Sequence, residues 1–256
     1  MYISCCAWGL PGSESDALRT LSKLPCSSID IQSGTYLNQH SSGISGKYQN
    51  KKSCIGLSFN MPESASLDSP YREKRRVALR HIKCGIDQAS KSGIDTAYII
   101  PDFSYEHISF FNDSLLKSAD LAEAAGIKLC VEHFPQRSLP TALKTLKHLQ
   151  ELNHPNLYLL LDVGHLQISN EDPQQIVESA GKRLGYVHLD DNDGKNDSHW
   201  ALCTGIMTLN SLKKLVKTLQ SSSYSGALSI ELNPRLSAPV KALQESLYIL
   251  QSILRS

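Results

Sequence analysis

Short apolar runs of strand length alternate with longer amphipathic segments along most of the chain. Eight runs read as buried strands: residues 2–8, 28–32, 54–59, 97–102, 128–133, 157–163, 186–190 and 227–232. Seven segments have helical periodicity: residues 13–24, 69–93, 114–126, 141–153, 173–184, 209–220 and 237–255. Strands that alternate with helices are typical of βαβ units and a parallel sheet, and eight such strands favour a closed barrel. We therefore predict a single (β/α)8 TIM-barrel domain that spans residues 1–256.

The segment between the second and third predicted strands departs from this alternation. Residues 34–53 are rich in Gly, Ser and polar side chains and show no apolar periodicity. We expect the second helix to be reduced or replaced by a loop. A βα-loop of a barrel lies on the face that carries active sites, so this segment is either a substrate cover or a plain surface connector.

The composition limits the classes of function. Lys plus Arg total 26 and Asp plus Glu total 25, and this balance argues against a nucleic-acid binder. The seven cysteines are odd in number and form no CxxC motif, which is typical of free, buried thiols in a reducing compartment. The N-terminus shows no signal-peptide pattern, and no window reaches the roughly 18 apolar residues of a membrane span. We expect a cytoplasmic protein with no nucleic-acid or membrane partner.

Polar residues stand near the C-terminal ends of the last four predicted strands, each two positions after a neutral residue. They are Glu132, Asp162, His188 and Glu231. Residues two apart on a strand share a face, so all four side chains can point into the barrel and meet at its rim. Three carboxylates need a counter-charge in a partly buried site, and no Lys or Arg occupies an inward position on these strands. The set therefore predicts one divalent metal ion, Mn, Mg, Co or Zn.

Several motifs in the second half resemble the xylose isomerase-like TIM-barrel superfamily, in particular its sugar phosphate isomerase/epimerase branch. They are VEHFP (131–135), LLLDVGHL (159–166), YVHLDDNDG (186–194), the DSH of residues 197–199 and SIELNP (229–234). The resemblance implies that the four predicted ligands bind the metal and that Glu132 and Glu231 form a catalytic proton-transfer pair. It also implies that His165, three positions past Asp162 on a βα-loop, contacts or polarises the substrate; otherwise His165 caps the following helix.

Other residues are assigned to the substrate by their position. Asp197 and His199 form the D-x-H that binds a further zinc in the endonuclease IV branch, but this chain lacks the two extra histidines of that branch. We expect these two side chains to contact substrate instead. Trp8 either walls the pocket or fills the barrel mouth. Arg235 and Lys195 are either the nearest cations for an anionic substrate tail or solvated loop charges.

The resemblance and the predicted ligands together favour a divalent-metal-dependent sugar or sugar-phosphate isomerase/epimerase that transfers a proton next to a carbonyl. Its substrate would be a small carbohydrate-like molecule. A metal-dependent dehydratase of an inosose or a dehydroshikimate-like acid would use the same ligands. A non-catalytic metal- or ligand-binding barrel is a third alternative, because Cys203 and Thr204 replace a glycine-rich stretch common in isomerase-like members. The oligomeric state stays open, with a homo-oligomer among the alternatives.

Overall fold

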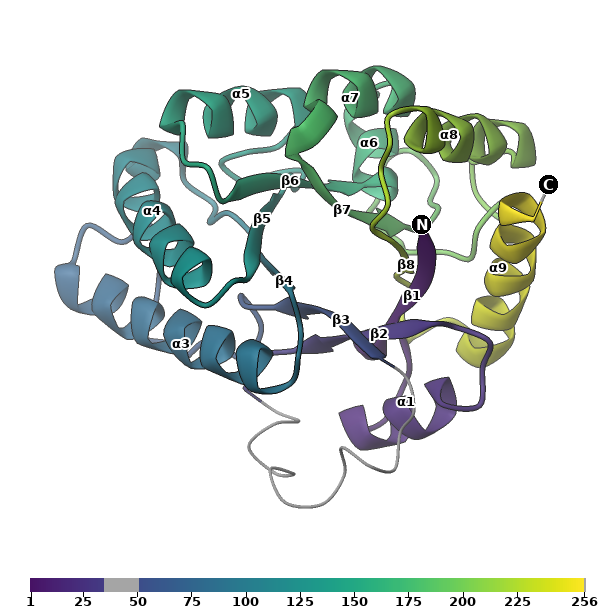
Figure 1. Cartoon of the computed structure of the whole chain (residues 1–256), viewed down its shortest axis with the longest axis horizontal. Coiled ribbons are helices and arrows are strands. Elements are labelled where there is room, and N and C mark those ends of the chain that lie inside the picture. The colour runs from purple at the N-terminus through teal and green to yellow at the C-terminus, as the bar shows by residue number, and fades with distance from the viewer. Residues whose placement is uncertain (35–50, 256) are drawn as a thin grey trace.

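The computed structural model describes residues 1–34 and 51–255, and its strands form a closed parallel barrel in the order β1 to β8 (Figure 1). The strands are β1 (Tyr2–Cys6), β2 (Ser28–Gln32), β3 (Lys51–Gly56), β4 (Thr96–Ile99), β5 (Lys128–Glu132), β6 (Leu157–Asp162), β7 (Leu184–Leu189) and β8 (Ala227–Ile230). The predicted (β/α)8 fold is confirmed. The predicted loss of the second helix falls mainly on residues 35–50, outside the described residues.

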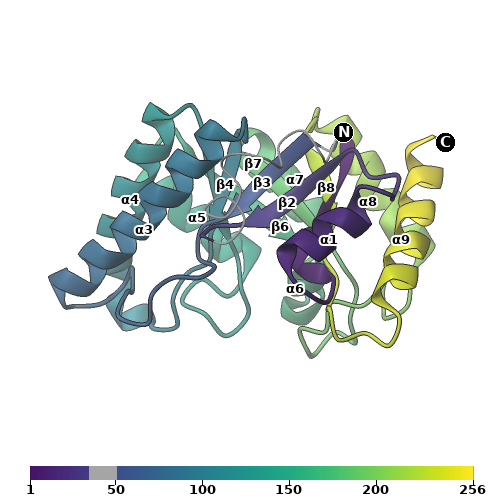
Figure 2. The same cartoon turned by 90° about the horizontal axis from the view of Figure 1, so that it is seen from below.

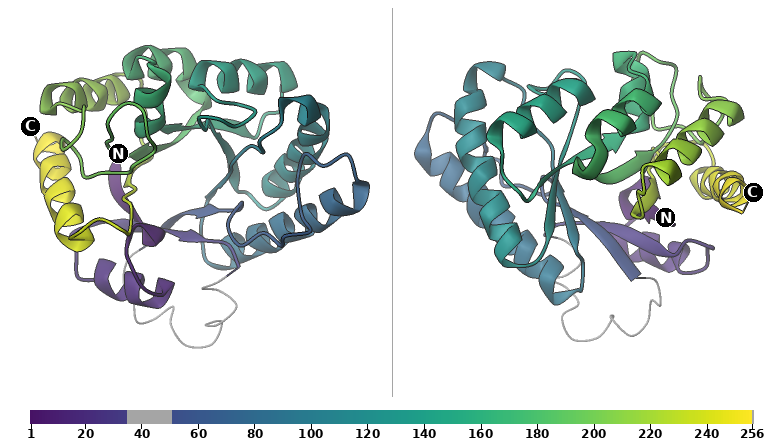
Figure 3. Two further views of the ribbon diagram at one scale, coloured as in Figure 1. Left: turned by 180° about the vertical axis from the view of Figure 1, so that it is seen from behind. Right: turned by 45° about the horizontal axis from the view of Figure 1, so that its top comes forward.

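Helices encircle the strands in views from both ends of the barrel and flank them in the side view (Figure 1, Figure 2 and Figure 3). The α-helices are α1 (Glu14–Leu21), α3 (Arg72–Lys91), α4 (Ile108–Ala124), α5 (Ala142–Leu152), α6 (Val163–Ser169), α7 (Pro173–Ala180), α8 (Leu209–Ser221) and α9 (Pro239–Leu254). The described residues also form the short 3-10 helices η1 (Ala7–Gly9), η2 (Tyr105–His107) and η3 (Gly181–Arg183). Among the described residues, no helix is both long and apolar enough to cross a bilayer.

Local signals set where several helices begin and end. Ser13 is the predicted N-cap of α1, and its hydroxyl accepts the backbone N–H of Asp16 while the Asp16 carboxylate accepts that of Ser13. Gly93 and Gly126 follow α3 and α4 with φ angles of +66° and +68°, which glycine adopts without steric cost. The predicted stops of these two helices are therefore confirmed.

The core has two parts that follow from the alternation of side chains along each strand. A large apolar layer fills the space between the sheet and the surrounding helices. A smaller cluster fills the barrel interior and consists of Cys54, Tyr98, Cys130, Leu160, Tyr186 and Ala227. Three members of the interior cluster stand two positions before a predicted metal ligand on the same strand. The same alternation therefore directs those ligands inward at the carboxyl ends of the strands.

Candidate metal and active site

Four side chains meet at the carboxyl ends of strands β5 to β8. Glu132 and Asp162 end β5 and β6, His188 lies near the end of β7, and Glu231 directly follows β8. One ligand atom from each residue lies within 4.8 Å of the others. The first three side chains are buried, and the side chain of Glu231 is only 12% exposed. The structure thus brings together the four residues that the sequence singled out.

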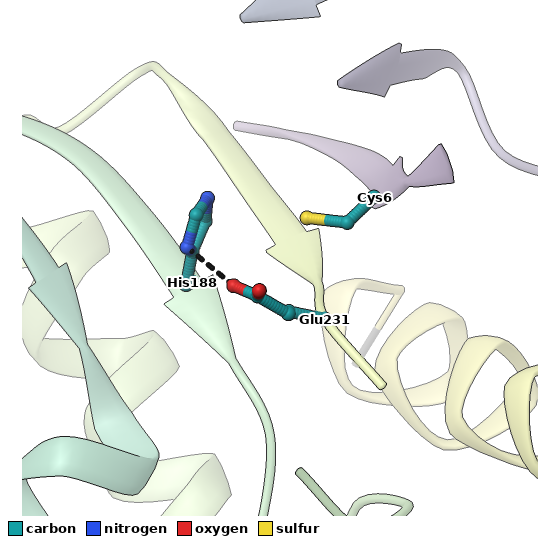
Figure 4. A group of neighbouring side chains, drawn as sticks. All are labelled: Cys6, His188 and Glu231. Carbon is teal, nitrogen blue, oxygen red and sulfur yellow. Dashed lines mark ion pairs between the residues drawn. The ribbon is translucent and has the colours of Figure 1, made fainter. Parts of the chain in front are cut away.

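The imidazole of His188 lies among the three carboxylates. Its Nδ1 atom lies 2.8 Å from Oε2 of Glu231, and Figure 4 shows these two side chains facing one another. The same nitrogen lies 3.8 Å from Oε1 of Glu132 and 4.0 Å from Oδ2 of Asp162. Among the described residues, Asp162 Oδ2 has no hydrogen-bond partner, and the nearest neighbour of His188 Nδ1 is the carboxylate of Glu231. Three buried carboxylates and one imidazole that converge on one point fit a divalent cation.

The charges of this cluster depend strongly on one another. Burial raises the pKa of Glu132, and burial together with Asp190 raises the pKa of Asp162 to about 7. Burial opposes ionisation of Glu231 as well, but the neighbouring His188 outweighs it and holds the pKa of Glu231 at about 2. Burial likewise opposes the charge on His188, yet Glu231 and the other carboxylates raise the pKa of His188 well above its ordinary value. Without a metal, a proton on His188 therefore serves as the counter-charge.

A second polar cluster adjoins the first. His199 Nδ1 lies 2.9 Å from Oδ2 of Asp190, and His199 Nε2 lies 3.1 Å from Oδ1 of Asp197. The same Asp197 oxygen lies 3.4 Å from Nε2 of His165. Burial lowers the pKa of His165, but Asp162 and Asp197 outweigh it and raise that pKa to about 10. His165, Asp197 and His199 thus form a connected acid–base chain beside the four-residue cluster.

The position of His165 differs from the expected loop. The residue lies in the first turn of α6, a helix that the sequence analysis did not predict. Asp162 is the N-cap of this helix, because its Oδ1 accepts the backbone N–H of His165 at 2.9 Å. His165 is therefore not the cap. Its Nδ1 lies 2.8 Å from the backbone oxygen of His133, and its other ring nitrogen, Nε2, faces Asp197.

Trp8 contributes directly to the wall of the site. The indole Nε1–H donates to Oε1 of Glu231 at 2.6 Å, and the ring packs on Phe59 with centroids 4.9 Å apart. Arg235 is exposed and shares with Trp8 the lining of a surface hollow of about 420 Å³. Lys195 is exposed as well. Arg235 therefore shares a lining with a residue that touches the cluster.

Two buried carboxylates near the cluster were missed at the sequence level. Asp30 on β2 is completely buried and lies 3.7 Å from His188 across the barrel interior. Asp190, directly after β7, accepts the backbone N–H of Gly164 at 2.9 Å and pairs with His199. An acidic residue inside an apolar strand, as in SIDIQ, is the signal that could have identified Asp30.

Comparison with known sequences gives a consistent picture. A family model described as xylose isomerase-like TIM barrel matches residues 47–253. An L-ribulose 3-epimerase of Methylomonas sp. is 34% identical over 134 residues, which cover 48% of this chain and 44% of the relative. An inosose dehydratase of Clostridium beijerinckii is 33% identical over 89 residues, which cover 35% of this chain and 30% of the relative. The chain spans about half the length of the curated relatives it matches, namely 62%, 44% and 57% of three of them.

Comparison with solved structures supports the fold. A crystal structure titled as L-ribulose 3-epimerase superposes with a TM-score of 0.81 and covers 99% of this chain and 94% of that one. The sequence identity of this pair is 17%. At this identity the match shows a shared barrel architecture and carries no assignment of substrate.

Proposed function

Because the chain belongs to the xylose isomerase-like TIM-barrel family, we propose that it is a divalent-metal-dependent sugar or sugar-phosphate isomerase or epimerase. The observation that carries this proposal is the convergence of Glu132, Asp162, His188 and Glu231 within 4.8 Å at the carboxyl ends of four strands. The similarity to a curated ketose epimerase favours a ketose or a related polyol ketone as the substrate. The reaction would transfer a proton next to the carbonyl of that substrate.

The four-residue cluster would hold the metal. Three carboxylates and one imidazole suit Mn, Mg, Co or Zn. When bound, such an ion polarises the substrate carbonyl and stabilises the negative charge that develops on its oxygen. His188 would present Nδ1, the nitrogen that faces the carboxylates, and would give up its extra proton on binding.

Glu132 and Glu231 would move the proton. One carboxylate would remove the proton from the carbon beside the carbonyl, and the other would return a proton from the opposite side. Return to the same carbon inverts its configuration, whereas return to the neighbouring carbon gives the isomer. Trp8 would orient Glu231 through its 2.6 Å hydrogen bond, and Arg235, near Trp8, would meet an anionic tail if the substrate has one.

A dehydratase is the second candidate, because the adjoining cluster offers an acid for a leaving hydroxyl. His165 and His199 share Asp197, and the pKa of His165 is raised to about 10, with burial opposing and the neighbouring carboxylates favouring its protonated form. The similarity to a curated inosose dehydratase points the same way. In an epimerase the same imidazoles would orient substrate oxygens instead.

Incubation with ketoses, inosose and dehydroshikimate in heavy water with Mn²⁺ tests the proposal. An isomerase or epimerase should incorporate solvent deuterium next to the carbonyl, whereas a dehydratase should release water and give a new enone absorbance. Glu132→Gln and Glu231→Gln should abolish either reaction, and Glu178→Gln, on an exposed position of α7, should not. Metal binding without deuterium exchange or loss of water would identify a non-catalytic barrel and contradict the proposal.

A further inference from the structure

Asp30 of β2 is a carboxylate held entirely inside the barrel. Its side chain has 0% exposure. Ser4 Oγ and the Tyr186 hydroxyl each donate to Oδ1 at 2.7 Å. Ser229 Oγ donates to Oδ2 at 2.6 Å. Three hydroxyl donors thus fix the orientation of this carboxylate and satisfy part of its hydrogen-bonding capacity.

The remaining neighbour of Asp30 is His188. Oδ2 of Asp30 lies 3.7 Å from Nε2 of His188, and this nitrogen has no hydrogen-bond partner among the described residues. In the described part of the chain, no Lys or Arg forms an ion pair with Asp30 within 4.0 Å. The closest group that can bear a positive charge toward Asp30 is therefore the imidazole of His188.

The imidazole of His188 is held with its two nitrogens facing different partners. Tyr98 and Tyr186 pack edge-on against the ring, with centroids 5.4 and 5.7 Å away and interplanar angles of 89° and 86°. Nδ1 faces Glu231 and the other carboxylates of the cluster, whereas Nε2 faces Asp30. Aromatic packing on this scale restricts rotation of the ring. Each nitrogen therefore keeps its own carboxylate neighbour.

We propose that Asp30 positions His188 for metal binding by holding the ring proton on Nε2, so that the lone pair of Nδ1 faces the other ligands. The inference rests on the proposed metal site. A neutral imidazole carries one proton, and the nitrogen that carries it cannot bind a metal. A carboxylate beside the other ring nitrogen favours the tautomer that carries its proton on that nitrogen and so orients a histidine ligand. Asp30 acts through His188 and touches no substrate.

Asp30 is also in contact with Cys6 and Ser229, which lie beside the four-residue cluster. Figure 4 shows Cys6 beside His188 and Glu231, at the end of the neighbouring strand β1. Its Sγ lies 3.7 Å from Oδ2 of Asp30 and 3.5 Å from Oγ of Ser229. The same Asp30 oxygen thus meets the thiol, the serine hydroxyl and the imidazole.

Asp30→Asn is the test, because the substitution keeps the shape and removes the charge. The measurement is the Mn²⁺ dissociation constant of the folded protein by calorimetry, which does not depend on activity. We expect about 10- to 100-fold weaker binding than in the wild type. The matched control is Ser53→Ala, since the Ser53 hydroxyl lies 2.8 Å from the Tyr186 hydroxyl in the same buried network but does not touch His188. Its Mn²⁺ affinity should stay within about twofold of the wild type.

The outcomes separate this inference from the proposed function. Wild-type protein that binds no Mn²⁺ would refute the metal site itself. Wild-type binding with an unchanged affinity in Asp30→Asn would overturn the role of Asp30 alone. If that variant does not fold, ¹⁵N-histidine NMR spectra of the Zn²⁺-loaded wild-type protein test which nitrogen of His188 carries the ring proton. They should show a downfield, slowly exchanging proton on Nε2 of His188, and a rapidly exchanging one would overturn the inference.

Discussion

The backbone N–H of Gly164 donates to Oδ1 of Asp190 at 2.9 Å, and a Cβ added to Gly164 would clash with both oxygens of that carboxylate. The glycine of the LDVGH motif is thus required by the buried carboxylate packed against it. Asp190 in turn pairs with His199 at 2.9 Å. A side chain at position 164 would therefore displace part of the second polar cluster.

Gly164→Ala is expected to destabilise the metal-free protein by about 1–3 kcal/mol, because the added methyl group overpacks a fully buried site. Urea unfolding followed by circular dichroism measures the change. Gln175→Ala, on an exposed position of α7, serves as the control and should change the stability by less than about 0.5 kcal/mol. A Gly164→Ala variant as stable as the wild type would contradict the close approach of Asp190.

Trp8→Phe isolates the hydrogen bond to Glu231. Phenylalanine keeps an aromatic ring against Phe59 but removes the Nε1–H that donates at 2.6 Å. A hydrogen bond to a charged group contributes about 1.5–3 kcal/mol, so kcat with a confirmed substrate should fall roughly tenfold or more. The melting temperature of the metal-free protein should fall as well, by about 2–4 °C for each kcal/mol lost. Equal kcat in the variant and the wild type would show that this bond does not orient Glu231.

The convergence of Glu132, Asp162, His188 and Glu231 could be predicted from the sequence because the rule that places them is local. Side chains two apart on a strand share a face, so Cys130 and Leu160 in the barrel interior imply inward positions for Glu132 and Asp162. No knowledge of the neighbouring strands is needed for that step. The parallel order of the strands then brings their carboxyl ends to one rim.

Asp30 and α6 could not be predicted in the same way. The partners of Asp30, among them Tyr186 and Ser229, come from strands far away in the sequence, and the stagger of the strands decides which of them meet. Helix α6 has only seven residues and directly follows β6, so its apolar side chains extend the strand pattern. Asp162 serves there both as a member of the cluster and as the N-cap of α6.

Metal binding should tighten as the pH rises. The carboxylates raise the pKa of His188 well above its ordinary value against the effect of burial, and burial together with Asp190 raises the pKa of Asp162 to about 7. In the proposed site both groups would bind metal only after losing a proton, so protons would compete with the ion below these pKa values. Mn²⁺ affinity should therefore rise by about tenfold per pH unit for each proton displaced. Calorimetry in buffers with different ionisation enthalpies measures the Mn²⁺ affinity and the number of protons released on binding. Binding without proton release would contradict the prediction.

Asp102, in the loop that follows β4, offers a test of stability away from the four-residue cluster. Its Oδ2 accepts the backbone N–H groups of Leu67 and Asp68 at 3.1 and 3.2 Å. Burial, together with the nearby Asp68 carboxylate, raises the pKa of Asp102 to about 6. An unfolded Asp titrates near about 3.9, so between these values the folded protein binds more protons than the unfolded chain. Ionisation of Asp102 therefore costs stability as the pH rises through this window, and the cost persists above it.

Asp102→Asn should remove that cost, because the amide oxygen can accept both backbone N–H groups and carries no charge at any pH. We expect the variant to be more stable than the wild type near about pH 8 by about 1 kcal/mol, a value reduced for the partial exposure of the side chain. The difference should vanish near about pH 4, where Asp102 is protonated. Urea unfolding at both pH values measures it. Asp113→Asn, which removes an exposed ion pair with Lys117, is the control and should be neutral or slightly destabilising. A variant less stable than the wild type at the higher pH would show that the Asp102 charge is favourable in the fold.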